Sequence, residues 1–363
     1  MHTGFNTLSL TTQDFYCSLQ LTFDRQNYQV KSNSPELLQA LGQYFSGYET
    51  RVTSSAVSIY LYDDEVQQPA IQWQKWTAEA GKTRQKEQYC DVEDGRWIHK
   101  LKTGMVLFQH LSAPLAIGPC EQFLSQTVNF IINQHINYLQ QQGGLICHAA
   151  CLQVQQQGIA IAALSGGGKS TTMLKLMDLP DSQFISNDRL FLFAESSGIV
   201  ARGVAKQPRV NPGTLLNNPK LVDILSVKRQ QELASMPGNA LWQLEEKYDV
   251  MVEQVYGKAS LGHSCPLQQV VLLNWQPGHN APVSMQSVSL DSRPDLIKAI
   301  AKSPGSFYQD ARGAFLNAAI IPPNQVYQDR LRSVQVWEVT GGADFDQLTD
   351  LLSQKISLQT MSS

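Results

Sequence analysis

A glycine-rich segment that ends in lysine and serine is where this chain could most directly do chemistry. Residues 163–171 read ALSGGGKST. Glycines in a tight turn let successive backbone N–H groups point at one anion, and a helix that begins there adds the positive end of its dipole. Lys169 would reach the outer phosphates of a polyphosphate, and the Ser170 hydroxyl would bind magnesium. The segment therefore predicts a phosphate-binding loop.

The residues on either side of the segment agree with that prediction. Residues 159–164 are apolar and strand-like, and residues 171–179 have helical spacing. The pattern G-x-x-x-x-G-K-[ST] is met except at Ala163, where its first glycine should stand. The alternatives are a plain glycine turn and the LSGG signature of ABC transporter ATPases, but that signature needs a separate upstream loop that the sequence lacks. The predicted nucleotide-binding residues are Ser165, Gly166, Gly167, Gly168, Lys169, Ser170 and Thr171.

A polar pair follows the next predicted strand. Asn187 and Asp188 come directly after the strand-like residues 184–185, one helix beyond the loop. An acid at the end of a neighbouring strand typically holds magnesium beside a phosphate loop, although an Asn-Asp pair is also typical of a turn. His148 lies in the apolar run before the loop strand, either as a site residue or as a buried histidine. The chain has no N-K-x-D stretch of the kind that GTPases carry.

The elements that must position these residues indicate a layered α/β domain over 144–363. Two apolar strands, the loop and a helix are followed by a hairpin around ESSG at 195–198 and a long helical stretch over about 220–256, interrupted near MPGN. A strand at QQVVLLNW, a helix opened by Pro294, a strand at SVQVWEV and a helix from about Phe345 complete the pattern.

Residues 1–143 have a different pattern. Apolar and polar residues alternate in several short runs, which predicts half-buried strands of a mostly antiparallel sheet. One helix is capped by Ser34 and opened by Pro35, and a second runs from about Glu121 to Gln142 before two glycines end it. We therefore expect an N-terminal α+β domain.

Composition narrows the classes of function. The chain has 363 residues, 42% hydrophobic and 16% charged, with 28 basic and 31 acidic residues and a formal charge of -3. Without a basic block, nucleic acid is not an expected partner. No apolar run reaches the roughly 20 residues of a membrane helix, no signal peptide is visible, and the six scattered cysteines suggest no disulfide framework. These features predict a cytoplasmic protein with no membrane partner.

His148, the glycine loop and the Asn187–Asp188 pair together resemble the bacterial HPr kinase/phosphorylase family. That family carries a histidine on the strand before the loop strand, then a Walker A loop, then two successive aspartates. The phrases CHAA, SGGGKST, SNDR and KQPRVNPGT are further similar to the HPr-kinase-related proteins, in particular the kinase B group. The resemblance implies a P-loop catalytic domain like that of HPr kinase and phosphoenolpyruvate carboxykinase, with ATP and Mg2+ as cofactors. It also implies a homo-oligomer.

Carried over residue by residue, the resemblance assigns roles to individual side chains. Lys169 and Ser170 match the phosphate lysine and the magnesium hydroxyl, and Asp188 matches the second aspartate. The catalytic residues that it implies are Asp188, His148, Lys169 and Arg202, and the metal ligands are Ser170 and Asp188.

Two departures from the family pattern weaken the match. Asn187 stands where the first aspartate, the usual base, is expected, and Val200 stands where a magnesium-holding glutamate is expected. Arg202, with Lys206 and Arg209, could instead neutralise charge on a transferring phosphate. The alternative for these three cations is a solvated hairpin face.

The leading hypothesis is an ATP-dependent kinase that transfers the γ-phosphoryl group to a hydroxyl of a protein Ser or Thr, or of a small molecule. The N-terminal domain would then recognise the acceptor or a partner. The alternative is a nucleotide-binding interaction or switch protein with weak ATPase activity and no phosphoacceptor. Asn187 and Val200 favour this alternative because they replace acids, whereas Lys169, Ser170 and Asp188 favour the kinase.

Overall fold

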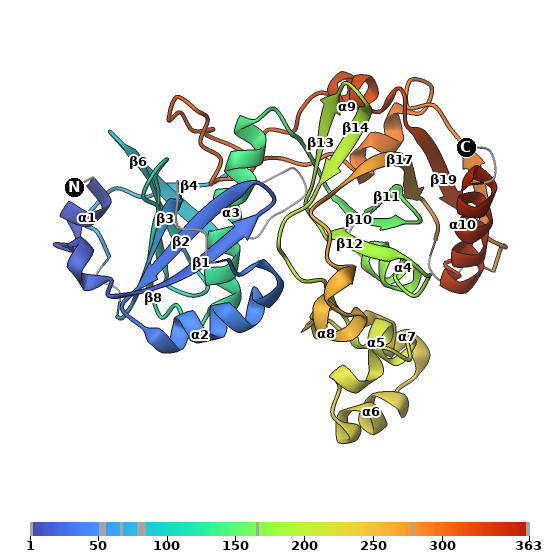
Figure 1. The fold of residues 1–363 in the computed structure, drawn as a ribbon, viewed down its shortest axis with the longest axis horizontal. Coiled ribbons are helices and arrows are strands. Elements are labelled where there is room, and N and C mark those ends of the chain that lie inside the picture. Colours follow the sequence, from blue (N-terminus) through green and yellow to red (C-terminus); the bar gives the residue numbers. More distant parts are fainter. Residues whose placement is uncertain are drawn as a thin grey trace. The chain divides into compact units, whose positions relative to one another are not determined.

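The chain forms two compact units in a computed structural model that describes residues 3–50, 56–65, 68–77, 85–164, 167–276, 278 and 280–360. The first unit comprises Met1–Gly144 and Ser303–Ile321, and the second comprises Leu145–Lys302 and Pro322–Ser363. The sequence predicted one continuous second domain over 144–363. The structure differs because the chain returns to the first unit over 303–321 before it completes the second (Figure 1).

The elements of the first unit alternate short strands with a few helices. They are α1 (Thr3–Thr7), η1 (Thr12–Asp14), β1 (Cys17–Phe23), β2 (Gln26–Ser32), α2 (Pro35–Tyr44), η2 (Ser46–Tyr48), β3 (Val57–Asp63), β4 (Gln74–Lys75), β5 (Glu87–Val92), β6 (Gly95–Lys100), β7 (Val106–Gln109), β8 (Leu115–Gly118) and α3 (Leu124–Gln141).

The first unit is built on a mixed sheet. Within the described residues the sheet has eight strands in the order β1-β2-β3-β8-β7-β6-β5-β4. The β2–β3 and β3–β8 pairs are parallel, and the other neighbours are antiparallel. The two parallel pairs arise because α2 and the 64–114 segment carry the chain across the sheet between them, a connection that alternation of residue types does not reveal.

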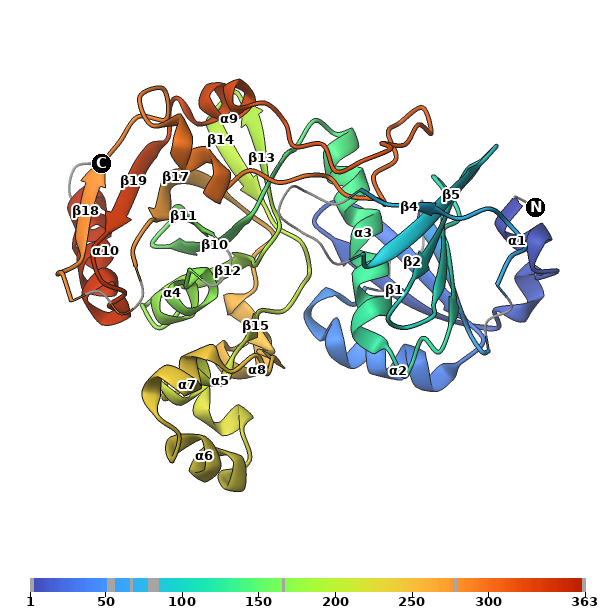
Figure 2. The same cartoon turned by 180° about the vertical axis from the view of Figure 1, so that it is seen from behind.

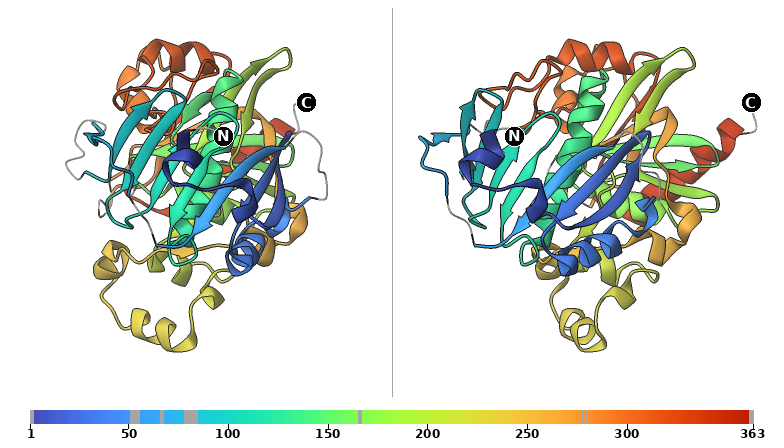
Figure 3. Two further views of the ribbon diagram at one scale, coloured as in Figure 1. Left: turned by 90° about the vertical axis from the view of Figure 1, so that its left-hand side faces the viewer. Right: turned by 60° about the vertical axis from the view of Figure 1, so that its left-hand side comes forward.

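Helices α2 and α3 lie against one face of this sheet (Figures 2 and 3). The Ser34 hydroxyl caps α2 by accepting the Leu37 N–H at 3.1 Å, and Leu37, Leu38 and Leu41 are buried beneath the helix. On the other face a second cluster of buried residues forms around Trp97. The sequence therefore located both helices correctly.

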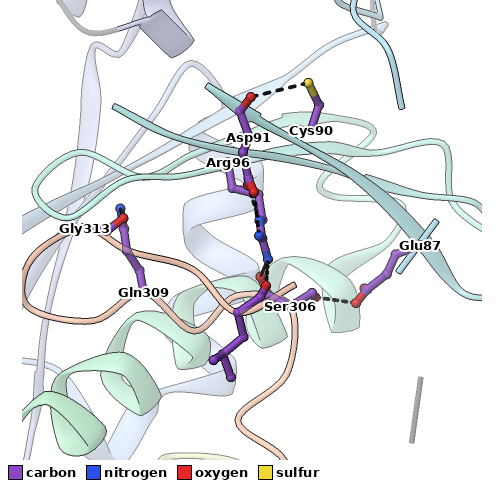
Figure 4. A network of polar contacts seen from close by, with 8 residues as sticks. Glu87, Cys90, Asp91, Arg96, Ser306, Gln309 and Gly313 are labelled. Carbon is purple, nitrogen blue, oxygen red and sulfur yellow. Dashed lines mark hydrogen bonds and ion pairs between the residues drawn. The ribbon is translucent and has the colours of Figure 1, made fainter. Parts of the chain in front are cut away.

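The segment Ser303–Ile321 is held to the first unit by the buried side chain of Arg96 (Figure 4). Its guanidinium donates to the Ser306 and Leu316 carbonyls at 3.2 and 2.8 Å and to the Asp91 carboxylate at 2.9 Å. It also lies 4.5 Å from the centroid of the Phe315 ring. A guanidinium has five donors, so one arginine can satisfy two carbonyls and a carboxylate together.

The second unit contains the glycine loop and its neighbours. Its elements are β9 (Leu145–Cys147), β10 (Ala149–Val154), β11 (Gln157–Ala163), α4 (Lys169–Leu176), β12 (Ser182–Ser186), β13 (Leu190–Glu195), β14 (Gly198–Arg202), β15 (Arg209–Val210), α5 (Pro212–Leu216), η3 (Val222–Ile224), α6 (Val227–Ala234), α7 (Gly238–Gln243), β16 (Tyr248–Asp249), α8 (Val252–Tyr256), η4 (Lys258–Ser260), β17 (Ser264–Leu273), β18 (Ser284–Ser287), η5 (Pro294–Ala299), α9 (Asn324–Leu331), β19 (Gln335–Thr340) and α10 (Phe345–Thr360).

The sheet of the second unit has helices on both faces, as an α/β fold requires. Its described strands run in the order β12-β10-β11-β17-β14-β13-β9, with β19 on β17 and β18 on β19. Alternate residues of β10 and β11 face opposite sides: Leu152 and Ile161 join the core under α4 and α10, whereas Cys151 and Ala160 join the core under η5 and α9 (Figure 1). The predicted α/β class is confirmed.

The predicted long helical stretch over 220–256 is wrong in its extent. The structure divides it into the short elements η3, α6, α7, β16 and α8. Pro237 lies before α7 with an extended backbone, and Tyr248–Asp249 pairs with β15 as a strand. The helix expected at Pro294 is the 3-10 turn η5. In Figure 2, α5, α6 and α7 form one group below α4.

None of the helices within the described ranges is both long and apolar enough to span a membrane.

Candidate nucleotide-binding and catalytic site

The glycine loop joins the end of β11 to the start of α4, as the sequence predicted. Gly168 caps the helix with a φ of 93°, a left-handed conformation that favours glycine. A Cβ on Gly167 would lie 2.7 Å from the Ala163 Cβ, so this position also excludes a side chain. Two of the predicted loop residues, Ser165 and Gly166, lie outside the described residues.

The first turn of α4 presents backbone N–H groups at the loop. The first intrahelical bond runs from the Thr172 N–H to the Gly168 carbonyl at 2.9 Å. The amides of Lys169, Ser170 and Thr171 precede that bond, so the helix itself supplies no acceptors for them. Such amides at a helix start, together with the dipole, favour an anion.

Lys169, His148 and Asp188 meet in one chain of contacts. The Lys169 Nζ lies 3.1 Å from the His148 Nε2, and the same Nε2 lies 3.1 Å from the Asp188 Oδ1. The Arg189 Nη1 donates to the Asp188 Oδ2 at 2.6 Å. Three residues that the sequence singled out separately therefore form one cluster, which we call the Lys-His-Asp cluster.

Strand pairing explains why these three residues meet. His148 lies between β9 and β10, and the Asn187–Arg189 segment lies between β12 and β13. Since β10 pairs with β12 and β9 pairs with β13, the two junctions come to the same place in the sheet. β10 also pairs with β11, with Ala149 opposite Ala162, which brings the junction to the end of the loop strand.

The His148 ring must choose between its two neighbours. Its Nε2 accepts a hydrogen bond from the Lys169 ammonium only when that nitrogen carries no proton, and donates to Asp188 only when it does. Both neighbours lie 3.1 Å away, so one proton position satisfies one contact and not the other. If the Lys169 ammonium moved from His148 to a bound anion, the His148 Nε2 could carry a proton and donate it in a hydrogen bond to Asp188.

Burial and neighbouring charges shift the protonation of all three groups. The hydrogen bond to Asp188 raises the pKa of His148. Burial and the charges of Lys169 and Lys302 lower it by more, so the pKa lies below its ordinary value of 6.5. Burial lowers the pKa of Lys169, against the attraction of Asp188. Burial raises the pKa of Asp188, but Arg189, His148 and Lys206 together hold it well below its ordinary value. Asp188 is therefore a carboxylate.

Asn187 and Asp188 point to different partners. The Ser170 hydroxyl donates to the Asn187 Oδ1 at 2.8 Å, whereas Asp188 contacts His148 and Arg189. Asp188 has a φ of 71°, and this left-handed turn separates the directions of the two neighbouring side chains. Of the two predicted metal ligands, Ser170 thus has Asn187 as its hydrogen-bond partner, while Asp188 contacts His148 and Arg189.

Oxygen donors at this point suit a hard divalent cation. Mg2+ prefers carboxylate, carbonyl and hydroxyl oxygens and keeps several waters or phosphate oxygens. The Ser170 hydroxyl and the Asn187 carbonyl oxygen fit that preference. Among the described residues no group of three or more His, Cys, Asp or Glu side chains is arranged to hold a metal ion, so phosphates or water would have to complete the coordination.

Two predicted residues have other partners. The Arg202 guanidinium donates to Glu195 at 2.8 Å and lies 4.5 Å from the Phe193 ring centroid, both on the β13–β14 hairpin. Strand pairing places Arg202 opposite Phe191, so its side chain runs along the hairpin toward the tip and away from the Asp188 end. The Thr171 hydroxyl bonds the Thr214 hydroxyl at 2.8 Å, which leaves its backbone amide for the loop.

The cations beside Asp188 are Arg189 and Lys206. Arg189 contacts the carboxylate directly, and Lys206 is close enough to lower the pKa of Asp188. The sequence pattern pointed to Lys206 but not to Arg189. The position of Arg189 directly after Asp188 in the sequence SNDR could have indicated that it lies at the site.

Comparison with known proteins gives distant matches. No protein-family model matches the chain. HPr kinase/phosphorylases from two strains of Treponema pallidum, one of them strain Nichols, are each 23% identical over 151 residues, which is 40% of this chain. The comparisons support a distant relationship to the HPr kinase/phosphorylases. The chain spans 46% of the length of these curated relatives.

A solved structure of the Hpr(Ser) kinase/phosphatase from Coxiella burnetii overlaps 60% of this chain and 99% of its own chain. It shows 10% sequence identity and a TM-score of 0.31.

Proposed function

We propose that the second unit binds ATP at the glycine loop and transfers its γ-phosphoryl group to a hydroxyl. The observation that carries the proposal is the Lys-His-Asp cluster at the start of α4. There the side chain of His148 links the loop lysine, Lys169, to the carboxylate of Asp188. The distant relationship to the HPr kinase/phosphorylases supports the same reaction class. The acceptor would be a protein Ser or Thr or a small molecule, which the first unit would help to recognise.

Binding would rest on the backbone and on one ammonium. The amides of residues 167–171 and the α4 dipole would hold the β- and γ-phosphates. The Lys169 ammonium would leave His148 for the phosphates, which carry more negative charge than a neutral imidazole. The Ser170 hydroxyl and the Asn187 oxygen would hold Mg2+, which when bound neutralises charge on the phosphates.

Transfer would use Asp188 as the proton acceptor. As the acceptor oxygen forms its bond to the γ-phosphorus, the bond to the β-phosphate oxygen breaks, ADP leaves and the hydroxyl proton passes to the carboxylate. The low pKa of Asp188 makes it a weak base toward a free hydroxyl. The hydroxyl becomes more acidic as its bond to phosphorus forms, so proton transfer would come late in the step.

His148 and Arg189 would position this carboxylate. With Lys169 on the phosphates, the His148 Nε2 can carry a proton and donate to one carboxylate oxygen, while Arg189 holds the other. Lys206 would also supply positive charge, a role that the sequence predicted for it together with Arg202 and Arg209. Arg189 would add to that charge.

The test uses ATP labelled in its γ-phosphate, magnesium and cell extract, with the wild type and two variants. Lys169→Ala should lose ATP binding and labelled product together. Asp188→Asn should keep ATP binding but lose labelled product by about 100-fold or more. A matched control is Asp181→Asn, since Asp181 is an exposed aspartate that also has a left-handed backbone, with φ of 55°.

The outcomes separate the kinase from the alternative. Labelled acceptor with the wild type and the control, but not with Asp188→Asn, supports the kinase. ATP binding without any labelled acceptor in any sample would favour the nucleotide-dependent switch protein, for which Asn187 in place of an acid is the supporting observation. Absence of ATP binding by the folded wild type would exclude both.

A further inference from the structure

Three aromatic side chains gather beside the glycine loop on the side away from Asp188. The Trp275 Nε1 donates to the Gly167 carbonyl at 3.0 Å. The Phe345 ring packs edge-on against Trp275, with centroids 5.1 Å apart and planes at 89°. Trp242 stacks on Phe345, with centroids 5.7 Å apart and planes at 26°. We call Trp242, Trp275 and Phe345 the aromatic patch.

Sheet register explains why the patch adjoins the loop. β11, β17 and β19 are parallel neighbours, and Ala163 pairs with Leu273, which pairs with Val339. The three strands therefore end level with one another. The loop follows β11, Trp275 follows β17 and Phe345 follows β19, so all three leave the same edge of the sheet. Ligands of parallel α/β sheets bind at this edge, outside the carboxyl ends of the strands.

The strand order also separates two flanks of the loop. β10 and β12 lie on one side of β11, and β17 and β19 lie on the other. The Lys-His-Asp cluster belongs to the first flank and the aromatic patch to the second. A molecule with phosphates at one end and rings at the other would span both flanks if its phosphates lay over the end of β11.

Exposure within the patch increases with distance from the loop. Trp275 is 7% exposed, whereas Trp242 is 44% exposed. Large aromatic side chains are normally buried deeply. Trp242 is exposed and is linked to the loop through Phe345, so it offers a stacking surface near the loop. Trp242 is carried by α7, outside the sheet, and its indole packs against Gly213, where a Cβ would come within 2.7 Å of the ring.

Gly168 of the loop leaves room for the rings of the aromatic patch. A Cβ on Gly168 would lie 2.6 Å from the Phe345 Cε1 and 3.3 Å from the Trp275 Cζ2. The glycine that starts α4 thus allows the aromatic rings to lie directly against the turn that would hold the phosphates.

We propose that the aromatic patch binds the base of the nucleotide, with the exposed indole of Trp242 as the main contact. This proposal rests on the proposed function, because the phosphates must first occupy the loop. Every nucleobase has a π-face, and stacking on an aromatic side chain needs no particular hydrogen-bonding edge. The patch would therefore add affinity for a nucleotide over an inorganic polyphosphate of the same length.

The test compares Mg2+-ATP with Mg2+-tripolyphosphate, which has the phosphates but no base, by calorimetry on the full chain. Trp242→Ala should weaken ATP binding about tenfold and leave tripolyphosphate binding unchanged. Trp242→Phe should restore most of the ATP affinity, since it keeps a ring. Val227→Ala is the matched control, because Val227 is a 69% exposed apolar residue of α6, and it should change neither ligand.

Each result decides one question. Equal ATP affinity of Trp242→Ala and wild type would overturn the proposal, and so would an equal loss for both ligands, which would mean that Trp242 supports the loop and not the base. Wild type that binds tripolyphosphate as tightly as ATP would also overturn it. Wild type that binds neither ligand would instead contradict the proposed function.

Discussion

At the scale of single residues, the direction of two neighbouring side chains decides what the site can do. Asn187 faces Ser170 and Asp188 faces His148, because Asp188 has a left-handed backbone. The sequence predicted that both positions belong to the site. The resemblance to the HPr kinase/phosphorylases gave Ser170 and Asp188 as metal ligands. Spacing along the chain gives no sign of the φ of 71° at Asp188, which depends on the turn between β12 and β13.

Asn187→Asp should strengthen magnesium-dependent nucleotide binding. A carboxylate there would still accept the Ser170 hydroxyl and would add a negative oxygen for the cation. We expect ATP affinity in magnesium to rise about threefold to tenfold, on the order of 1 kcal/mol, with no gain in a chelator. Calorimetry with and without magnesium measures this. Asn187→Ala is the control and should weaken binding, and an equal gain with and without magnesium would contradict the prediction.

The half-buried histidine of the cluster, His148, predicts a pH dependence of stability. Because the folded pKa of His148 lies below 6.5, the unfolded chain binds the proton more readily. His148 therefore contributes stability that is present above about pH 6.5 and is lost as the pH falls through the folded pKa.

Urea denaturation at about pH 7.5 and about pH 5.5 tests this sign. The free energy of unfolding of the wild type should fall more between the two pH values than that of His148→Gln, which does not titrate. His99 and His110 also have lowered pKa values, but both proteins contain them, so the difference isolates His148. Parallel pH profiles of the two proteins would refute the prediction.

At the scale of elements, the end of β14 passes close to the end of β12. Gly203 is the residue at this crossing, since a Cβ there would lie 1.8 Å from the Ile185 carbonyl oxygen. The Val204 N–H then reaches the Ser186 hydroxyl at 3.3 Å. Position 203 therefore needs a glycine because a side chain would collide with the backbone of β12. The preceding residue, Arg202, contacts the β13–β14 hairpin instead.

Gly203→Ala should destabilise the second unit by about 2 kcal/mol or more, because two backbones must separate to admit the methyl group. Gly238→Ala is the matched control: a Cβ at Gly238 would meet nothing within 4 Å, and the residue begins α7. We expect this control to be neutral or slightly stabilising. Chemical denaturation measures both, and equal stability of the two variants would show that the crossing tolerates a side chain.

Local patterns predicted the elements around the site well. The apolar run, the glycine turn and the helical spacing gave β11, the loop and α4, and Pro35 and Ser34 gave the start of α2. The helical stretch over 220–256 was overestimated in length, because Tyr248–Asp249 pairs with β15 as the strand β16 and a break at Pro237 separates α6 from α7. Which side chains touch depends on pairing between distant strands. For this reason local patterns did not reveal the contacts of Arg202 with the β13–β14 hairpin, nor the gathering of Trp242 and Phe345.

At the scale of the whole molecule, the two units share the chain unequally. The described residues 303–321 belong with the first unit although they follow most of the second. No linker composition marks this return, and its main anchor, Arg96, lies more than 200 residues earlier. The sequence therefore indicated the boundary beside Gly144, but it did not indicate that the chain returns to the first unit over Ser303–Ile321.

Arg96→Met should loosen this segment. The variant removes the donor to the Ser306 and Leu316 carbonyls and leaves Asp91 without its guanidinium. We expect the first unit to lose about 2–3 kcal/mol of stability and amide exchange to rise over 303–321. Hydrogen-exchange mass spectrometry measures this, with Arg25→Met, an exposed arginine of the same unit, as the control. Unchanged exchange over 303–321 would show that other contacts hold the segment.

The return of Ser303–Ile321 also sets an order for synthesis. A ribosome makes the sheet of the first unit early, but the carbonyls that Arg96 needs emerge only after most of the second unit has been translated. During that interval the Arg96 guanidinium has the Asp91 carboxylate but lacks the Ser306 and Leu316 carbonyls. The first unit can therefore complete its native packing only once residues 303–321 have left the exit tunnel.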